Sequence, residues 1–299
     1  AGVPPAERVT SASVPQRSGA ADPDALSTER RMTHHLQAVW TYRHFWMSLV
    51  QMDLRQKYRR SVLGLGWSLV NPLAMAAVFC VVFKDLMKIA DWRVYGCYLI
   101  GGFAVWDFLR NSLLSGCSTF VRNESYIRQC PLPYGIYPLR TVMGTAIHFL
   151  IALGVVLAMV VVLQPALPNG DSVDLLNGIP SAVPGILLAF VFAWSIATLA
   201  AFATVYFHDT QHLCEVGAQL FFFLTPIMYT RQVLDAKGLS WLVDINPVNV
   251  YLELIRGPLT LGETPATALY LQGCVLSAVA FGLACGTIAW LQKKLIFQL

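Results

Sequence analysis

The stretch TVMGTAIHFLIALGVVLAMVVVL, Thr141–Leu163, contains no Asp, Glu, Lys or Arg. A helix needs about 20 consecutive apolar residues to cross the hydrocarbon core of a membrane, so this stretch predicts a transmembrane helix. Further apolar runs of the same kind are Trp67–Phe83, Tyr95–Thr119, Pro184–Phe207, Leu213–Tyr229 and Ala266–Leu291. The sequence therefore predicts an all-α integral membrane protein with six transmembrane helices.

The composition supports this class. Hydrophobic residues make up 56% of the 299 residues and charged residues only 13%, against roughly 25% charged residues in soluble domains. The Lys and Arg residues cluster between the apolar runs rather than on one face. The net charge of +4 therefore does not indicate nucleic-acid binding. The seven cysteines include no CxxC pair, and we interpret them as buried apolar residues rather than disulfides or metal ligands.

The chain divides into three regions. Residues 1–33 are rich in Ala, Pro, Ser and charge, which indicates a disordered cytosolic tail. Residues 34–60 predict an amphipathic helix in the membrane interface that ends in a basic elbow, and residues 61–299 form the six-span domain. The polar face of the interfacial helix includes His44, Ser48, Gln51 and Arg55. The elbow consists of Arg55, Lys57, Arg59 and Arg60.

Basic residues predict the orientation in the membrane. They are frequent in the elbow before the first span, in the connection between the second and third spans, and at the end of the chain, where Lys293 and Lys294 stand. Loops rich in Lys and Arg face the cytosol, so we expect cytosolic N- and C-termini. The opposite loops also carry some basic residues, which makes the bias weaker toward the end of the chain.

The connection Arg231–Pro265 between the last two spans is too apolar for a simple solvated loop. Pro is favoured at the first position of a helix, so Asn246-Pro247 predicts a helix start. We expect two short helices that enter the outer leaflet and return. Candidate gate residues in this re-entrant pair are Trp241, Asn246, Pro247 and Tyr251.

Two charged residues of the second span, Asp107 and Arg110, lie three positions apart and therefore on one helical face. Charge inside a membrane is costly unless it is paired or hydrated. Two interpretations remain open: the pair lines a water-filled path or a subunit interface, or it is a satisfied structural pair.

Motifs for covalent chemistry are not found. The loop GPLTLGET, Gly257–Thr264, has the glycine spacing of a phosphate-binding loop, but Glu263 stands where that loop needs lysine. His208 and His212 lie four residues apart near Glu215, yet polar residues in a short turn explain them better than a metal site. We therefore expect a chain that is not an enzyme and that binds no cofactor or metal.

Two sequence stretches resemble a known family. The first is RQKYRRSVLG, Arg55–Gly64, which leads to WSLVNP, Trp67–Pro72. The second is FFLTPIMY, Phe222–Tyr229, followed by INP at Ile245–Pro247. Both are similar to the permease subunits of ABC-2 type exporters, specifically those that export O-antigen, capsular polysaccharide or teichoic acid. The resemblance covers the chain from about Leu36 to its end.

This resemblance implies a homodimer in the cytoplasmic (inner) membrane of a bacterium, bound to two copies of a cytosolic ABC ATPase that holds ATP and Mg²⁺. The substrate would be a lipid-linked polysaccharide that moves between the subunits. Aromatic residues that could stack on sugar rings, together with the charged pair, give the candidate path or interface residues Trp67, Tyr95, Phe103, Trp106, Asp107, Arg110, Phe221 and Phe222. Alternatives are an ABC-2 exporter of drugs or lipids and a membrane-embedded glycosyl- or acyltransferase.

The cytosolic connection Asn123–Cys130 predicts a short helix that docks on the ATPase. Asn123 would cap this helix, Glu124 suits its first turn, Arg128 suits its last turn, and Tyr126 with Ile127 would form an exposed apolar anchor. A helix that lies in a groove is a common way for a partner to bury such a pair. The alternative is that both residues sink into the lipid headgroups.

Overall fold

The computed structural model describes residues 43–57, 59, 66–86, 91–129, 132–163, 173–229, 234, 238 and 240–295. These residues are helical with short connections, and no strand occurs among them. The predicted tail, the first part of the predicted interfacial helix, and Arg60 lie outside the described residues.

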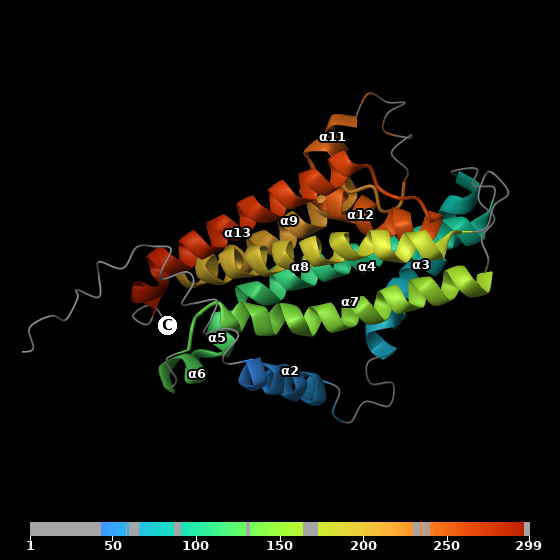
Figure 1. Cartoon of the computed structure of the whole chain (residues 1–299). Coiled ribbons are helices and arrows are strands. Elements are labelled where there is room, and N and C mark those ends of the chain that lie inside the picture. The colour runs from blue at the N-terminus through green and yellow to red at the C-terminus, as the bar shows by residue number, and fades with distance from the viewer. Residues whose placement is uncertain are drawn as a thin grey trace, which may run out of the picture.

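The longer helices run side by side in one bundle, and the shorter ones lie at its sides and ends (Figure 1). The bundle helices are α3 (Trp67–Leu86), α4 (Trp92–Cys117), α7 (Ile136–Leu163), α8 (Leu175–Tyr206), α9 (Thr210–Leu224), α12 (Pro247–Leu261) and α13 (Thr267–Leu295). The others are α2 (Arg43–Lys57), α5 (Thr119–Arg122), α6 (Glu124–Gln129) and α11 (Ser240–Ile245).

Each of the six predicted spans falls mainly within one helix of the bundle. Within the described residues, three segments are long and apolar enough by themselves to cross a membrane: Ile136–Leu163, Leu175–Tyr206 and Thr267–Gln292. The segment Leu73–Val82 of α3 is a shorter apolar helix. The prediction of an all-helical membrane protein is therefore confirmed, and the count of six crossings stays a prediction.

Two helices differ clearly from the predicted spans in where they start or end. Helix α8 starts before Pro184, because the Asp174 carboxylate accepts hydrogen bonds from the backbone of Leu176 and Asn177 and so caps it. The fifth helix ends at Leu224 rather than near Tyr229. Thr225 already has an extended backbone, and the following proline has no N–H to continue the helix.

Helix α4 lies at the centre of the bundle and packs against α3, α7, α8, α9 and α12. Most of its side chains are buried, and the ring of Phe108 stacks on Phe149 of α7 with centroids 4.6 Å apart. A Cβ atom added to Gly116 would lie 2.6 Å from the Ala197 Cα atom of α8, so glycine is what permits this close helix crossing.

Helix α12 lies against α4 and the first half of α8. Its residue Leu254 passes so close to Gly185 that an added Cβ would meet the Leu254 side chain at 2.9 Å, and the Pro258 carbonyl lies still closer to the Cβ position of Gly178. Asn246 caps α12 through a 3.0 Å hydrogen bond from the Val248 N–H, as the Asn246-Pro247 start predicted. The two predicted helices of this connection are thus present as α11 and α12.

Helix α2 packs on α7, outside the main bundle and beside α5 and α6 (Figure 1). Leu49 and Val50 are buried against the bundle. The side chains that were predicted to form the polar face are exposed: His44, Ser48, Gln51 and Arg55. The predicted polar face is therefore exposed in the described part of α2, as are Met47 and Met52, and its place in the membrane interface stays a prediction.

Candidate functional site

The chain between α4 and α7 forms two short helices, α5 and α6, which together we call the α5–α6 segment. The predicted helix in this connection is confirmed as α6, Glu124–Gln129. Its acidic residue lies in the first turn and its basic residue in the last, and Arg128 Nε donates to Glu124 Oε1 at 2.8 Å. Both side chains are exposed, so this ion pair adds little stability.

Asn123 has a different role from the predicted helix cap. Its side chain is buried, its Nδ2 donates to the Thr119 carbonyl at 2.7 Å, and its Oδ1 accepts from Arg140 Nη1 at 2.7 Å. The backbone carbonyl of Asn123, not its side chain, receives the N–H groups of Tyr126 and Ile127. The prediction of a side-chain cap was therefore wrong, because the amide is fully engaged with α5 and α7.

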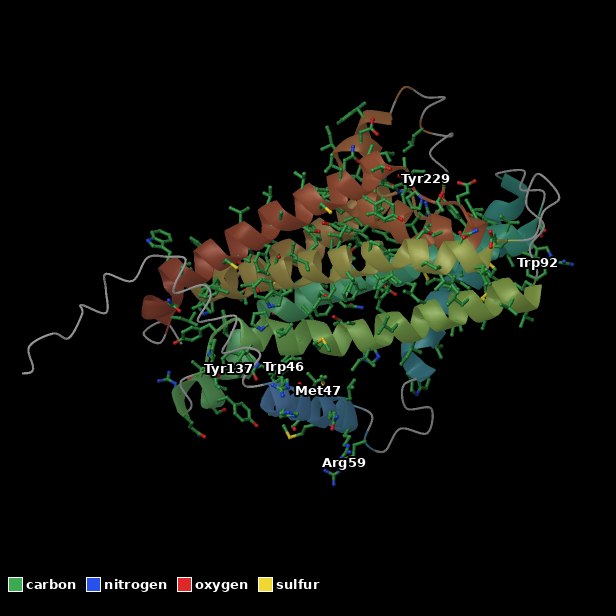
Figure 2. All side chains as sticks on the ribbon, in the orientation of Figure 1. Trp46, Met47, Arg59, Trp92, Tyr137 and Tyr229 are labelled. Atoms are coloured by element: carbon green, nitrogen blue, oxygen red, sulfur yellow. The ribbon has the colours of Figure 1, made fainter. Side chains whose placement is uncertain are left out.

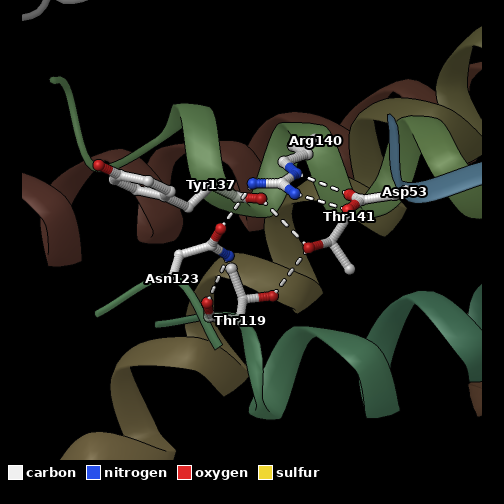
Figure 3. A network of polar contacts seen from close by, with 6 residues as sticks. All are labelled: Asp53, Thr119, Asn123, Tyr137, Arg140 and Thr141. Atoms are coloured by element: carbon white, nitrogen blue, oxygen red, sulfur yellow. Dashed lines mark hydrogen bonds and ion pairs between the residues drawn. The ribbon is translucent and has the colours of Figure 1, made fainter. Parts of the chain in front are cut away.

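Arg140, in the second turn of α7, connects three segments that are distant in sequence. Its Nε and Nη2 donate to the two carboxylate oxygens of Asp53 in α2 at 2.7 and 2.6 Å, and its Nη1 donates to Asn123 (Figure 3). The Arg140 Cζ also lies 5.8 Å from the ring centroid of Tyr126. A bidentate arginine–carboxylate pair is strong and fixes geometry in a way that a single contact does not.

Two hydroxyl groups extend this network between α5 and α7. The Thr119 and Thr141 hydroxyls lie 3.0 Å apart, and Thr141 also donates to the Tyr137 carbonyl at 3.2 Å (Figure 3). We name the set Asp53, Thr119, Asn123, Arg140 and Thr141 the Arg140 network. No local pattern in the sequence points to Asp53 or to its contact with Arg140, since 87 residues separate the two.

Ile127 is buried inside the protein, which corrects the predicted exposed pair. It packs in a cluster with Phe120, Tyr137 and Phe202. Tyr134 lies at the edge of this cluster, and burial raises the pKa of its phenol. Tyr126 is half-buried next to Arg140.

The outward surface of the α5–α6 segment is made of other residues than the predicted anchor. Val121 is the large apolar side chain there, with 57% of its surface exposed. The remaining exposed side chains of the segment are Arg122, Ser125, Arg128 and Gln129. A partner that binds this segment from outside therefore meets an apolar residue, the neighbouring Arg122, and the ion pair of Arg128 with Glu124.

The residues of the predicted basic elbow point to solvent where they are described. Arg55 and Arg59 are exposed, and Figure 2 shows Arg59 projecting away from the bundle on the α2 side. Lys57 is the last residue of α2.

Four of the aromatic residues predicted to line a path are packed inside the chain. Phe103 stacks between Phe79 and Phe222 with centroid distances of 5.8 and 6.1 Å, and Trp106 lies 5.6 Å from Phe222. Tyr95 is buried and donates to the Met228 carbonyl at 2.8 Å. The two others, Trp67 and Phe221, are exposed.

Asp107 and Arg110 lie on the one stripe of α4 that the neighbouring helices leave open. Both side chains are half-buried, and Asn111 beside them is exposed, whereas Phe108 and Leu109 between them are buried. Among the described residues, no hydrogen bond to the Asp107 carboxylate occurs. Both interpretations of the pair, a hydrated path or interface and a structural pair, therefore stay open.

The end of α9 is held by polar contacts from α4 and α12. Arg256 Nη1 donates to the Pro226 carbonyl at 2.9 Å, and Asn246 Nδ2 donates to the Thr225 hydroxyl at 2.8 Å. Of the predicted gate residues, Asn246 and Tyr251 are buried, and the Tyr251 hydroxyl lies 2.9 Å from Ser277 Oγ. Trp241 on α11 is exposed.

The two weak motifs do not form sites in the described structure. Gly257–Leu261 belong to α12, so the loop GPLTLGET begins as a helix rather than as a phosphate cradle. His212 lies 3.6 Å from Glu215 but is largely exposed. No group of three or more His, Cys, Asp or Glu side chains able to hold a metal ion occurs among the described residues.

The long apolar helices and the all-helical bundle are the architecture of a polytopic membrane protein, with a buried polar network at the predicted cytosolic end. Residues 44–259 match the ABC-2 type transporter family. The match covers most of the chain, and the chain belongs to this family.

Curated relatives are similar over nearly their full length. Two O-antigen export system permease proteins RfbA from Klebsiella pneumoniae are 27% and 26% identical over 241 and 238 residues, which is 79% of this chain and 88% of each relative. The O-antigen export system permease protein RfbA from Myxococcus xanthus is 23% identical over 228 residues, which is 73% of this chain and 80% of the relative.

Proposed function

We propose that this chain is the permease subunit of an ATP-driven exporter that moves a lipid-linked, O-antigen-like polysaccharide across the cytoplasmic membrane of a bacterium. The observation that carries the proposal is the similarity to O-antigen export permeases along most of the length of both proteins. Family membership supports the coarser part, a transporter permease. That the substrate is a lipid-linked polysaccharide is the more specific part of the proposal, and it needs its own test.

The proposed assembly is a homodimer with two copies of a cytosolic ABC ATPase, which binds ATP and Mg²⁺. The translocation path then runs between the two permeases. The half-open stripe of α4 with Asp107, Arg110 and Asn111 supports this placement, because hydrated charge is tolerated in a water-filled path and costly against lipid. Exposed Trp67 and Phe221 remain candidate stacking residues for sugar rings.

The proposed membrane topology has six crossings, with both termini in the cytosol. Helix α9 spans only Thr210–Leu224, which at 1.5 Å per residue is about 22 Å and shorter than a hydrocarbon core of about 30 Å. We propose that α11 and α12 are a re-entrant pair that enters the outer leaflet beside the end of α9 and returns to the outer side. The polar contacts to Thr225 and Pro226 support a chain break inside the membrane, where freed backbone groups need partners.

The decisive experiment is deletion of this chain in its bacterium, followed by analysis of polymer in the cytosol and on the cell surface. The proposal expects lipid-linked polysaccharide to accumulate inside and to disappear from the surface, and a plasmid copy should restore export. Unchanged surface polymer, together with altered efflux of drugs or altered lipid distribution, would instead support the alternative ABC-2 exporter.

The proposed ATPase contact is the exposed surface of the α5–α6 segment. Val121→Glu places a charge at the centre of this surface and should reduce co-purification of the ATPase strongly. The matched control is Phe207→Glu, because Phe207 is an apolar residue with 73% of its surface exposed in the neighbouring turn between α8 and α9. Equal ATPase recovery with both variants would exclude the α5–α6 segment as the contact.

A further inference from the structure

The Arg140 network joins three parts of the chain through one buried side chain. Arg140 has 9% of its side-chain surface exposed, and the Asp53 side chain 46%. Its guanidinium contacts Asp53 of α2 and Asn123 of the α5–α6 segment, and it is itself carried by α7. The network therefore bridges the interfacial helix and the segment that we propose as the ATPase contact (Figure 3).

Helix α2 packs on the described bundle mainly through α7, where Leu49 and Val50 are buried. The bidentate pair between Asp53 and Arg140 adds a charged contact of fixed direction to this apolar packing. A shift of Arg140 by more than a hydrogen-bond length must either carry α2 along or break this pair.

Asn123 connects the exposed surface of the α5–α6 segment to the guanidinium of Arg140. Its amide spans from the Thr119 carbonyl to Arg140 Nη1, both at 2.7 Å, and the α6 backbone begins at the next residue. Exposed Val121 and Arg122 immediately precede Asn123 in α5. A force on this surface therefore reaches Arg140 through one side chain whose donor and acceptor are both engaged.

We propose that Arg140 is a positioning residue that transmits displacement of the α5–α6 segment to α2, so that the interfacial helix moves when the ATPase closes. The identity of the driving partner rests on the proposed function. The mechanical tie between Asn123, Arg140 and Asp53 does not, and it can be measured in the permease without its partner.

The first test measures amide hydrogen exchange of the purified full-length permease in lipid nanodiscs. Arg140→Gln and Asp53→Asn should each raise exchange in α2 on the order of tenfold, since each removes the charged pair that fixes this helix. The control is Arg55→Gln, which removes an exposed charge from the same helix and should leave exchange unchanged. Unchanged α2 exchange in both network variants would show that the pair between Asp53 and Arg140 does not hold α2 in place.

The second test uses the permease with its ATPase, with and without trapping of the ATP-bound state by vanadate. In the wild-type complex, trapping should change exchange in both the α5–α6 segment and α2. In Arg140→Gln, the change in the α5–α6 segment should remain and the change in α2 should disappear, while polymer export falls on the order of tenfold and ATP hydrolysis stays within about twofold.

The outcomes separate this inference from the proposed function. If trapping changes α2 equally in wild type and in Arg140→Gln, the transmission role is wrong even when export itself is confirmed. If no ATPase binds the permease, the proposed function fails, and the first test still decides the tie. If Arg140→Gln does not fold, Asp53→Asn replaces it in both tests, because Asp53 is half-exposed and its amide retains the shape of the carboxylate.

Discussion

Arg256 of α12 covers the ring of Tyr98 in α4, with its Cζ atom 3.7 Å from the ring centroid. The same guanidinium donates to the Pro226 carbonyl, so it connects α4, α12 and the chain that follows α9. Gly101 makes room for this contact, because a Cβ there would lie 3.3 Å from the Arg256 Cγ. One buried guanidinium thus holds the chain that follows the end of α9 against α4 and α12.

Replacement of Arg256 by Gln should lower stability, because the Pro226 carbonyl loses its charged donor at 2.9 Å and keeps the longer, 3.5 Å hydrogen bond from the Tyr98 hydroxyl. The loss of such a hydrogen bond costs roughly 1–3 kcal/mol, together with the lost cation–π contact. Thermal unfolding in detergent measures the effect. Arg93→Gln is the matched control, since Arg93 is exposed near the start of the same helix as Tyr98, and an equal Tm for both variants would contradict this role.

Gly116→Ala should force α4 and α8 apart, because the new Cβ would lie 2.6 Å from the Ala197 Cα and 2.8 Å from its carbonyl oxygen. Overpacking of this kind costs about 1–3 kcal/mol. Gly154→Ala in α7 meets nothing within 4 Å and replaces glycine in a helix, so its Tm should be unchanged or slightly higher. A Gly116→Ala chain as stable as wild type would show that this crossing is looser than the structure indicates.

The double variant Asp107→Leu/Arg110→Leu should insert normally and export poorly, since the half-open stripe of α4 would lose its hydration. Asp107→Asn/Arg110→Gln keeps polar groups at both positions and should retain more export. Membrane yield and surface polymer are measured for both. Normal export by the Leu variant would assign the pair a structural role only.

The purified permease alone should neither bind nor hydrolyse ATP. In a phosphate-binding loop, backbone N–H groups at a helix N-terminus face the phosphates, whereas here the loop glycines end α12, with Gly262 as its C-terminal cap. Glu263→Lys should therefore leave ATP binding absent as well. Binding of a fluorescent ATP analogue by either chain would contradict this prediction.

Topology reporters should place the end of the chain in the cytosol and the segment Leu167–Asn177 outside. Alkaline phosphatase and green fluorescent protein fused at these two sites give opposite signals for opposite sides. With an odd number of crossings between the two sites, as six spans require, the signals must differ. The same signal at both sites would exclude the six-span topology.

The sequence by itself determined the helices. In the hydrocarbon core of a membrane the backbone N–H and C=O groups find no water, so they must bond to one another within a helix. Long apolar runs therefore predict where helices lie, and local signals such as Asn246-Pro247 predict where some of them start. These are properties of neighbours in sequence. The residues of α6 and the outward face of the described part of α2 followed from the same local patterns.

Only the tertiary structure decided which polar side chains meet. Asp53 and Arg140 are 87 residues apart, and Arg256 donates to the Pro226 carbonyl 30 residues away. No periodic pattern in the sequence predicts either contact. The same holds for Ile127, which looks exposed in a short polar loop but is buried because the Phe120 cluster folds over it. Burial depends on how helices cross, and the crossings are set by close approaches such as Gly116 on Ala197, which apolar run lengths do not encode.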